Sequence, residues 1–264
     1  MLKGAIHIHS TYSDGEFTLD ELRQILMEAG CSFVCMTDHA EFFDDEKLEA
    51  YRSECESLSD DRFRFIAGLE YTCDGRMHVL GLGSTSFAGT TDSQKVIRHI
   101  EDQAGLSVIA HPMDSMFDWI ETFDTLPHGI ETWNSKYDGR YAPRPRTFRL
   151  LARLQKRKPE MCAFYGIDLH WKKQFRGLFN IVRTSELETE RILLALTSGN
   201  YFATKGDLEL SSRGELSESL MSRFEKTHSR SDRLRRFAKA AKRVTSGAGL
   251  APPAVVKSHL RKIF

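Results

Sequence analysis

The sequence predicts an α/β fold in which parallel strands alternate with helices. Short apolar segments typical of strands alternate with amphipathic segments typical of helices from the N-terminus to about residue 203. The chain has 264 residues, which is enough for one substantial core and is a common length for a single α/β barrel. Its 41% hydrophobic and 28% charged residues are typical of a globular protein and exclude a disordered or fibrous one.

Nine segments have the length and apolar content of strands. They are Ala5 to His9, Ser32 to Thr37, Phe63 to Leu69, Met77 to Leu82, Leu106 to Ala110, Gly129 to Trp133, Cys162 to Gly166, Leu178 to Arg183 and Tyr201 to Ala203. Helices are expected between most of them, which is the arrangement of βαβ units around a parallel sheet.

The first expected helix has sequence signals at both ends. Thr18 and Glu21 form a capping box, and Gly30 ends the helix. Its apolar face consists of Leu19, Leu22, Ile25 and Leu26. The other expected helices are Asp44 to Leu58, Ser93 to Gln103, Arg144 to Gln155 and Ser185 to Leu196.

The composition changes after Tyr201, and we place a domain boundary near Lys205. Residues 1–204 form the main domain, and residues 205–264 form a basic, partly helical or disordered C-terminal extension. From Ser211 to Phe264 there are 13 Lys or Arg against 4 Asp or Glu, so this segment carries +9 and the preceding residues carry −9. The extension is expected to contain one amphipathic basic helix, Asp232 to Val244, which would suit an anionic membrane or nucleic acid. Docking of this helix against the acidic body, or plain disorder, is the favoured alternative.

The protein is expected to be cytoplasmic. The chain lacks the run of about eighteen apolar residues that a membrane span needs, and its N-terminus lacks the pattern of a signal peptide. Because His7 and His9 belong to the candidate site, cleavage of the N-terminus would destroy that site. Five cysteines without a CxxC pair indicate buried free thiols in a reducing compartment.

Residue types that bind divalent metals recur where the expected strands end. The first strand ends in His7-Ile8-His9, and because side chains alternate along a strand, both imidazoles should project from one side, about 7 Å apart. Nine potential ligands lie at or just after strand ends: His7, His9, Asp14, His39, Glu70, His78, His111, Asp168 and His170. In barrels and open α/β sheets the reacting groups gather at this edge. The set therefore predicts a metal-dependent active site.

Each of these signals alone is weak, but coincidence is a poor explanation for all nine. A single His-x-His or His-Pro is often structural, yet six of the ten histidines belong to the set. The other four, His99, His128, His228 and His259, lie on expected helices or loops and are interpreted as structural. Asp38 should point to the opposite face from His39, as an outer or structural carboxylate.

The chain resembles the polymerase and histidinol phosphatase (PHP) family over residues 4 to about 204. The resemblance depends on the ordered motifs His-x-His-Ser-x-x-Ser-Asp-Gly, Thr-Asp-His, Gly-x-Glu, His-Val-Leu-Gly, Ala-His-Pro and Asp-x-His. It implies a distorted (β/α)7 barrel that holds up to three divalent metals and hydrolyses phosphate esters.

The resemblance also implies three sets of ligands. They are His7, His9, Glu70 and Asp168 for the first metal, Glu70, His78 and His111 for the second, and Asp14, His39 and His170 for the third. Asp14 stands where some members have a histidine, so the chain is more similar to the branch of small-nucleotide phosphatases and 5′ exonucleases than to histidinol phosphatase. The interval from Glu70 to His78 is short for that branch, and the large insertion between its middle strands is absent.

The ligand types suit hydrolysis of a phosphate ester. Glu70 can bridge two cations about 3.5 to 4 Å apart, and a water bound between them becomes the nucleophile near neutral pH. A third cation would neutralise the phosphoryl oxygens. We assign catalytic roles to Glu70, His111, Asp168 and His170, and expect two or three Mn, Zn or Fe ions, among which these ligand types do not choose. The cysteines lack a base partner and are expected to lie in the core.

Candidate substrate-binding residues follow a strand at the same edge. They are Asn134, Lys136, Arg140 and Arg144, with Lys172 and Lys173 as alternatives. Trp133 or Tyr137 offers a stacking face. For any one of the polar candidates, a solvated or helix-capping role is the simpler interpretation.

Three functions fit these observations. The first is hydrolysis of a phosphomonoester on a small nucleotide or sugar phosphate by a metal-bridging hydroxide, which a short chain without an added domain favours. The second is a 5′-3′ exonuclease on RNA or DNA oligonucleotides, in which the basic extension contacts the backbone and binding depends strongly on salt. The third is a non-catalytic metal-binding domain, against which the completeness of the ligand set argues. A phosphotyrosine protein is a further alternative substrate.

Overall fold

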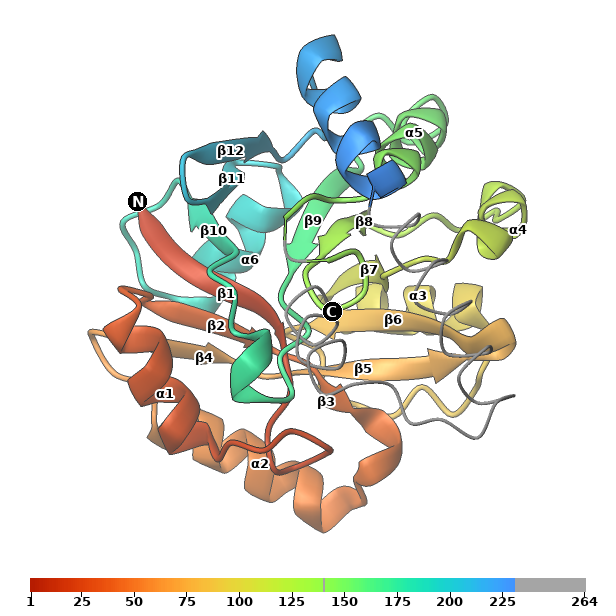
Figure 1. Ribbon diagram of the computed structural model, residues 1–264. Coiled ribbons are helices and arrows are strands. Elements are labelled where there is room, and N and C mark those ends of the chain that lie inside the picture. The colour runs from red at the N-terminus through yellow and green to blue at the C-terminus, as the bar shows by residue number, and fades with distance from the viewer. Residues whose placement is uncertain (140, 231–264) are drawn as a thin grey trace, which may run out of the picture. The chain divides into compact units, whose positions relative to one another are not determined.

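The computed structural model describes residues 1–139 and 141–230 (Figure 1). Three features of the sequence analysis lie outside the described residues: the candidate Arg140, the expected helix Asp232 to Val244, and His259. The chain divides into two compact units, Met1–Leu216 and Ser217–Phe264. The first unit is a mixed α/β fold with two six-stranded sheets. In the second unit, residues 218–230 are helical.

The strands of the two sheets come from different parts of the chain. The first sheet contains β1 (Leu2–Ile8), β2 (Phe33–Met36), β4 (Arg64–Ile66), β10 (Phe179–Val182), β11 (Tyr201–Lys205) and β12 (Leu208–Ser211), in the order β12-β11-β10-β1-β2-β4. The second contains β3 (Asp38–His39), β5 (Gly68–Cys73), β6 (Met77–Leu82), β7 (Leu106–Ala110), β8 (Gly129–Asn134) and β9 (Cys162–Gly166), in the order β3-β5-β6-β7-β8-β9.

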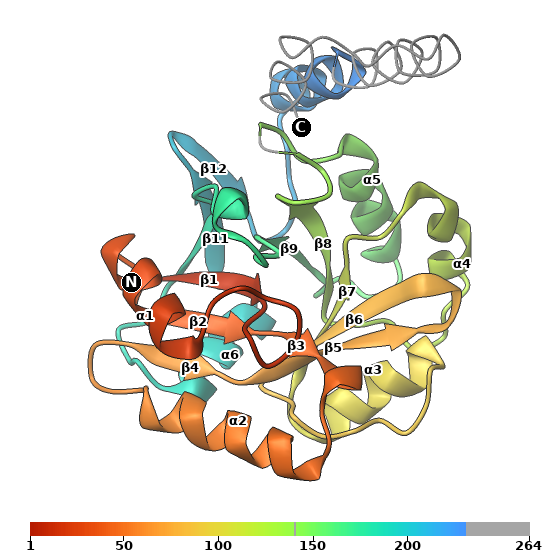
Figure 2. The ribbon, with the colours of Figure 1, turned by 60° about the horizontal axis from the view of Figure 1, so that its bottom comes forward.

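The described part of the first unit has six α-helices, which lie around the strands (Figure 2). They are α1 (Leu19–Glu28), α2 (Asp45–Ser57), α3 (Ser93–Asp102), α4 (Phe117–Glu121), α5 (Pro145–Leu154) and α6 (Thr189–Thr197). Helix α3 contacts β6 and β7, α5 contacts β8 and β9, and α6 contacts β4 and β10. The expected capping box is present, since Thr18 Oγ1 accepts from Glu21 N and the Glu21 carboxylate accepts from Thr18 N. Helix α4 is short and was not expected from the sequence.

The expectation of a parallel sheet is confirmed for only some of the strand pairs. Strand β6 pairs antiparallel with both β5 and β7, while β7, β8 and β9 are parallel. The physical reason is the connection between β5 and β6, which is the single turn Asp74–Arg76 with Gly75 at φ 66°. A parallel crossover needs about a dozen residues, so a turn of this length allows only a hairpin. Because β5 and β6 form this hairpin, Glu70 and His78 are close both in sequence and in space.

The two sheets meet at the C-terminal end of β1. Strands β2 and β4 of the first sheet lead directly into β3 and β5 of the second. Beyond β9, Ile167 N donates to Ile6 O at 3.0 Å, and His9 N donates to Leu169 O at 3.0 Å. These connections bring the ends of β1, β3, β5 and β9 together. The assigned strands form two sheets, so the seven-stranded barrel stays a prediction.

The first unit extends beyond the boundary that we placed near Lys205. Strand β12 pairs antiparallel with β11, and its Leu210 is buried. Ser211 O accepts from Tyr165 Oη at 2.6 Å, and Ser212 O accepts from Ala163 N at 2.7 Å. The structure therefore moves the boundary to Leu216, because β12 completes the edge of the first sheet.

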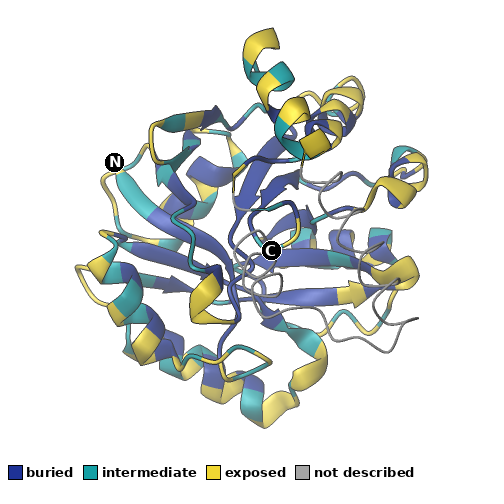
Figure 3. Ribbon diagram, viewed as in Figure 1, coloured by how far each residue is buried: buried dark blue, intermediate teal, exposed yellow. Residues whose placement is uncertain are grey.

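Burial follows the strands, which are mostly dark blue in Figure 3. All five cysteines are free and buried, as the sequence predicts: Cys31, Cys35, Cys55, Cys73 and Cys162. Among the described residues, no helix combines the length and the apolar character needed to cross a membrane.

Candidate metal centre

The structure brings all nine predicted ligands into one cluster. Their ligand atoms fall into four overlapping groups, within each of which the atoms lie within 4.8 Å of one another. The groups are His9, Asp14, His39 and His170; His7, His9 and Asp168; His7, Glu70 and His111; and His39, Glu70 and His78. The residues come from β1, β3, β5 and β6 and from the segments that follow β1, β7 and β9. The grouping differs from the one that the resemblance implies, because His9 also joins Asp14, and His78 lies with His39.

Glu70 occupies the centre of the cluster. Its Oε2 atom lies 3.2 Å from His7 Nε2 and 3.2 Å from His9 Nε2. Its Oε1 atom lies 2.7 Å from His78 Nδ1 and 3.2 Å from His111 Nε2. Each carboxylate oxygen thus faces a different pair of imidazoles, and Glu70 belongs to two of the four groups.

Asp14 and Asp168 flank His170 on the other side of the cluster. Asp14 Oδ1 lies 3.1 Å from His170 Nε2, and Asp168 Oδ1 lies 3.2 Å from His170 Nδ1. His39 Nε2 is 3.7 Å from the same Asp14 oxygen. The ring centroids of His9 and His170 are only 4.0 Å apart, so these two imidazoles are in direct contact.

Three cluster residues have an unusual backbone conformation. His7, His111 and Asp168 have φ values of 66°, 27° and 54°, in the left-handed region that non-glycine residues rarely adopt. At His7 the pairing of β1 with β2 is shifted by a bulge between Ile6 and Ile8. The expectation of a regular strand at His7 and His9 is therefore wrong, although both side chains reach the cluster. Such strain persists where surrounding structure over-determines it, and it is typical of functional sites.

Burial and neighbouring charges shift the pKa values of the cluster residues away from their usual values. Burial lowers the pKa of His9 to about 3, against the opposing effect of Glu70, so its imidazole is neutral. Burial alone would also lower the pKa of His7, but the charges of Glu131, Glu70 and Asp168 raise it well above its usual value. Burial disfavours the charged forms of Glu70 and Asp168, yet the positive charge of His7 lowers both of their pKa values well below the usual range. Both carboxylates are therefore ionised at neutral pH.

The residues fit divalent cations. Both ring nitrogens of His9 and Nδ1 of His39 are buried without a hydrogen-bond partner among the described residues. Leaving buried polar atoms without partners is costly, so atoms of this kind usually have a ligand. The mixed set of imidazoles and carboxylates is the donor set that Mn²⁺, Zn²⁺ and Fe²⁺ accept.

Asp38 has the outer position that the sequence predicts. It is fully buried and accepts hydrogen bonds from Ser10 N at 2.8 Å, Ser10 Oγ at 2.9 Å and Ser13 Oγ at 2.6 Å. These bonds hold the segment between His9 and Asp14.

The sequence analysis missed one residue of the site, Glu131. It lies in β8, its carboxylate is buried, and its Oε1 atom is 2.8 Å from His7 Nδ1. Its Oε2 atom accepts from His111 N at 2.8 Å and from Asn134 Nδ2 at 3.0 Å. An acidic residue inside an otherwise uncharged strand was the signal that could have identified it.

The candidate substrate residues divide into two groups. Asn134 and Lys136 reach the cluster, since Asn134 Nδ2 donates to Asp168 Oδ2 at 3.0 Å and Lys136 Nζ lies 2.8 Å from Asp168 Oδ1. Arg144 instead pairs with Asp138 at 2.7 Å, next to α5. Lys172 is exposed, and its backbone N–H donates to the Glu16 carboxylate. Among the described hydrogen bonds and ion pairs, none joins either of these two side chains to the cluster.

Trp133 cannot serve as a stacking face. Its side chain is fully buried, and its Nε1 atom donates to Gly139 O at 3.0 Å. Tyr137, the alternative, is 45% exposed, and its ring lies tilted against His111 with ring centroids 4.5 Å apart.

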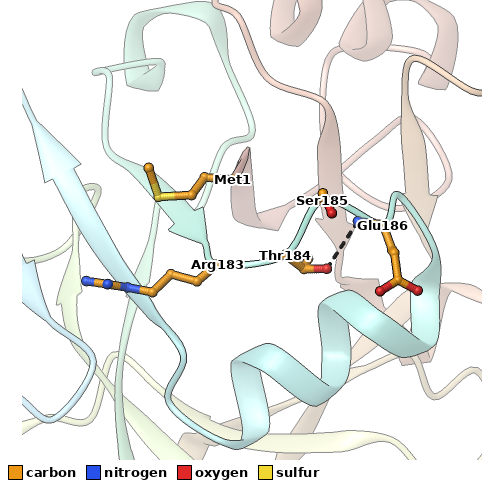
Figure 4. A pocket seen from close by; sticks show the side chains of 5 residues that line it. All are labelled: Met1, Arg183, Thr184, Ser185 and Glu186. Carbon is orange, nitrogen blue, oxygen red and sulfur yellow. Dashed lines mark hydrogen bonds between the residues drawn. The ribbon is translucent and has the colours of Figure 1, made fainter.

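Two of the histidines interpreted as structural, His99 and His128, have partners away from the cluster. His99 Nε2 lies 2.9 Å from Ser86 Oγ, and His128 Nδ1 lies 3.2 Å from Ser107 Oγ. A separate hollow, lined by Met1, Arg183, Thr184, Ser185 and Glu186, contains none of the predicted site residues (Figure 4). Its two charged side chains have partners, because Arg183 lies over the Phe202 ring and Glu186 pairs with Arg191.

One curated relative is similar over a short segment. Over 77 residues the chain is 30% identical to the DNA polymerase/3'-5' exonuclease PolX of Bacillus subtilis (strain 168). This match covers 26% of the chain and only 14% of PolX.

Solved structures and a family model extend the similarity to most of the chain. A two-domain protein from Bacteroides vulgatus ATCC 8482, containing a predicted PHP-like metal-dependent phosphoesterase, matches with a TM-score of 0.58 and 18% identity, over 85% of this chain and 69% of that one. An amidohydrolase from Chromobacterium violaceum with bound sulfate and no metal matches with a TM-score of 0.51 and 15% identity, over 75% and 96%. These similarities show the fold alone. The model of the PHP domain matches residues 5–242, and the chain therefore belongs to the PHP domain family.

Proposed function

We propose that this protein is a metal-dependent phosphomonoesterase that acts on a small phosphorylated molecule with an aromatic base, a nucleotide rather than a sugar phosphate. The observation that carries the proposal is the convergence of the nine predicted ligands in one cluster, in which each oxygen of Glu70 faces a pair of imidazoles. Divalent cations, when bound, would supply an activated water and a positive charge for the phosphate.

The protein's own side chains provide the rest of the site. Neutral His9 and ionised Glu70 and Asp168 are in the states that bind cations. Lys136 Nζ lies 2.8 Å from Asp168 Oδ1 and 3.3 Å from His170 Nδ1, and its side chain is partly exposed. A lysine at this position can receive a phosphoryl oxygen as negative charge develops.

Exposed aromatic side chains favour a base over a plain sugar. Phe42, Tyr137 and Trp171 are 47%, 45% and 42% exposed, and we call them the aromatic rim. Each lies beside a cluster histidine, with ring centroids 6.1 Å apart for Phe42 and His39, 4.5 Å for Tyr137 and His111, and 5.5 Å for Trp171 and His170. Stacking of one base on an aromatic ring contributes about 1 to 3 kcal/mol.

The second candidate is a 5′-3′ exonuclease on RNA or DNA oligonucleotides. The aromatic rim also suits successive bases of a single strand, and the +9 charge of residues 211–264 suits a phosphate backbone. Binding that weakens steeply between low and high salt would favour this candidate. The alternative in which the basic extension docks on its own domain predicts no such salt dependence.

The predicted barrel and the predicted cytoplasmic location are part of the same proposal. A (β/α)7 barrel is supported by the hydrogen bonds between β1 and the residues after β9, and by the direct passage of β2 into β3 and β4 into β5. The cytoplasmic location is supported by five free, buried cysteines.

A substrate screen tests the activity. Protein supplied with Mn²⁺ is assayed for phosphate release from adenosine 5′-phosphate, adenosine 3′,5′-bisphosphate, ribose 5-phosphate, phosphotyrosine peptide and a 5′-phosphorylated oligonucleotide. The His9→Ala and Asp168→Ala variants should lose at least about 100-fold in kcat/KM, while His99→Ala, outside the cluster, should not. If wild type and variants release phosphate equally slowly from every compound, the protein is not this enzyme.

A second assay tests the aromatic rim. Trp171→Leu should raise KM for the base-containing substrate about 5- to 100-fold and leave the KM for ribose 5-phosphate unchanged. Trp119→Leu is the matched control, because Trp119 is 38% exposed and packs on Phe123, away from the cluster. Equal effects of Trp171→Leu on both substrates would exclude base stacking at this position and leave the phosphatase activity standing.

A further inference from the structure

Glu131 connects two ligands of the cluster through one buried carboxylate. Its Oε1 atom lies 2.8 Å from His7 Nδ1, and the opposite ring nitrogen, His7 Nε2, lies 3.2 Å from Glu70 Oε2. Its Oε2 atom accepts the backbone N–H of His111, whose φ is 27°. One side chain of β8 therefore contacts both His7, at the end of β1, and His111, after β7.

We propose that Glu131 is a positioning residue that sets the affinity of the cluster for divalent cations through His7. A carboxylate at this position can only accept a hydrogen bond, so the proton of a metal-binding His7 must be on Nδ1. The lone pair of Nε2 then faces Glu70 and Asp168, where a cation would bind. A carboxylate behind a ligating histidine fixes the ring orientation and raises its basicity.

The glycine at position 166 provides independent support. A Cβ atom on Gly166 would lie 1.8 Å from Glu131 Oε1 and 2.9 Å from His7 Cβ. Gly166 does not have a positive φ, so its backbone conformation does not require glycine. The residue is needed because β9 passes directly beside the contact between Glu131 and His7.

Substitution by glutamine distinguishes a positioning carboxylate, whose loss weakens metal binding, from a merely structural one. Glu131→Gln keeps the shape of the side chain but replaces one acceptor oxygen with a donor. If the amide NH₂ faces His7 Nδ1, the ring proton moves to Nε2 and blocks the ligand atom. If the amide NH₂ instead faces the backbone N–H of His111, two hydrogen-bond donors face each other without an acceptor. The metal site should therefore weaken even where the fold is retained.

The test is a double-mutant cycle on cation binding, measured calorimetrically with Mn²⁺ on chelator-treated full-length protein. Glu131→Gln should weaken Mn²⁺ binding about 10- to 100-fold. In a His7→Ala background, which keeps the group His9, Asp14, His39 and His170, the same substitution should change the remaining affinity less than about 3-fold. An equal loss in both backgrounds, or no loss in either, overturns the proposal.

The chain offers a matched control in Glu101, whose Oε1 atom lies 3.4 Å from Nδ1 of the structural His128. Glu101→Gln should leave Mn²⁺ affinity unchanged, and a loss equal to that of Glu131→Gln would overturn the proposal. If Glu131→Gln does not fold, a measurement on the wild-type protein still tests the proposal. In the Zn²⁺-loaded protein, the ¹⁵N shifts of His7 should show the proton on Nδ1, and a proton on Nε2 would refute the assignment. None of these readouts depends on phosphatase activity, so the inference and the proposed function can fail separately.

Discussion

Asp38 shows how a single residue outside the ligand set supports the site. Its buried carboxylate accepts three hydrogen bonds from Ser10 and Ser13, which precede the ligand Asp14. Asp38→Asn removes acceptor capacity and leaves a buried donor without a partner, so it should lower the free energy of unfolding by about 1 to 3 kcal/mol. Urea denaturation in the presence of EDTA measures this loss apart from metal binding.

The control for Asp38→Asn is Asp74→Asn. Asp74 accepts a hydrogen bond from Thr91 Oγ1 at 2.7 Å, but it is exposed, so water can replace the lost bond. Equal midpoints for wild type and Asp38→Asn would show that the three hydrogen bonds add nothing to stability.

The burial of the five cysteines predicts that their thiols react slowly in the native protein. Burial raises the pKa of Cys31 and of Cys73 to about 12, and it raises the pKa of Cys55 well above its usual value. Because the thiolate is the reactive form, a disulfide reagent such as DTNB at pH 8 should modify none of them within minutes in the native protein. All five should react after unfolding in guanidinium chloride. A fast reacting thiol in the native protein would contradict the burial described here.

Strand β12 determines where the first unit ends. A chain ending at Lys205 lacks β12 and leaves Ala163 N and the Tyr165 hydroxyl without their partners Ser212 O and Ser211 O. A chain ending at Leu216 keeps all of these bonds. We expect the shorter chain to be insoluble or to unfold at a urea concentration well below that of the longer one, because buried polar groups without partners each cost about 1 to 3 kcal/mol. Identical denaturation midpoints for the two chains would restore the boundary to Lys205.

Cation binding should stabilise the molecule as a whole. The cluster holds ligands from both sheets, so a cation that binds only the folded state shifts the unfolding equilibrium. At a Mn²⁺ concentration 100 times its Kd, the expected gain is about 2.7 kcal/mol, seen as a higher Tm than in EDTA. Asp168→Ala should lose most of this shift, and His99→Ala should retain it. A Tm that Mn²⁺ leaves unchanged would argue against a metal centre.

Parts of the fold and of the site were predictable from local signals. The bounds of β6, β7 and β9 agree with the sequence analysis, because each is a short apolar segment with clear ends. The gathering of the nine predicted ligands in one cluster was also predictable, since these residue types recur at or just after strand ends. Strand direction was not predictable in the same way, because β6 pairs antiparallel on both sides through a three-residue turn and a long connection.

The sequence by itself determined which residue types gather at the strand ends, because strand periodicity and ligand chemistry act over a few neighbouring positions. Only the tertiary structure decided which of the predicted ligands lie within reach of one another, that Glu131 lies behind His7, and that Tyr137 is exposed while Trp133 is buried. These facts depend on contacts between residues far apart in the chain, such as Glu131 and His7. Local propensity carries no information about such contacts, because packing between separate elements sets them.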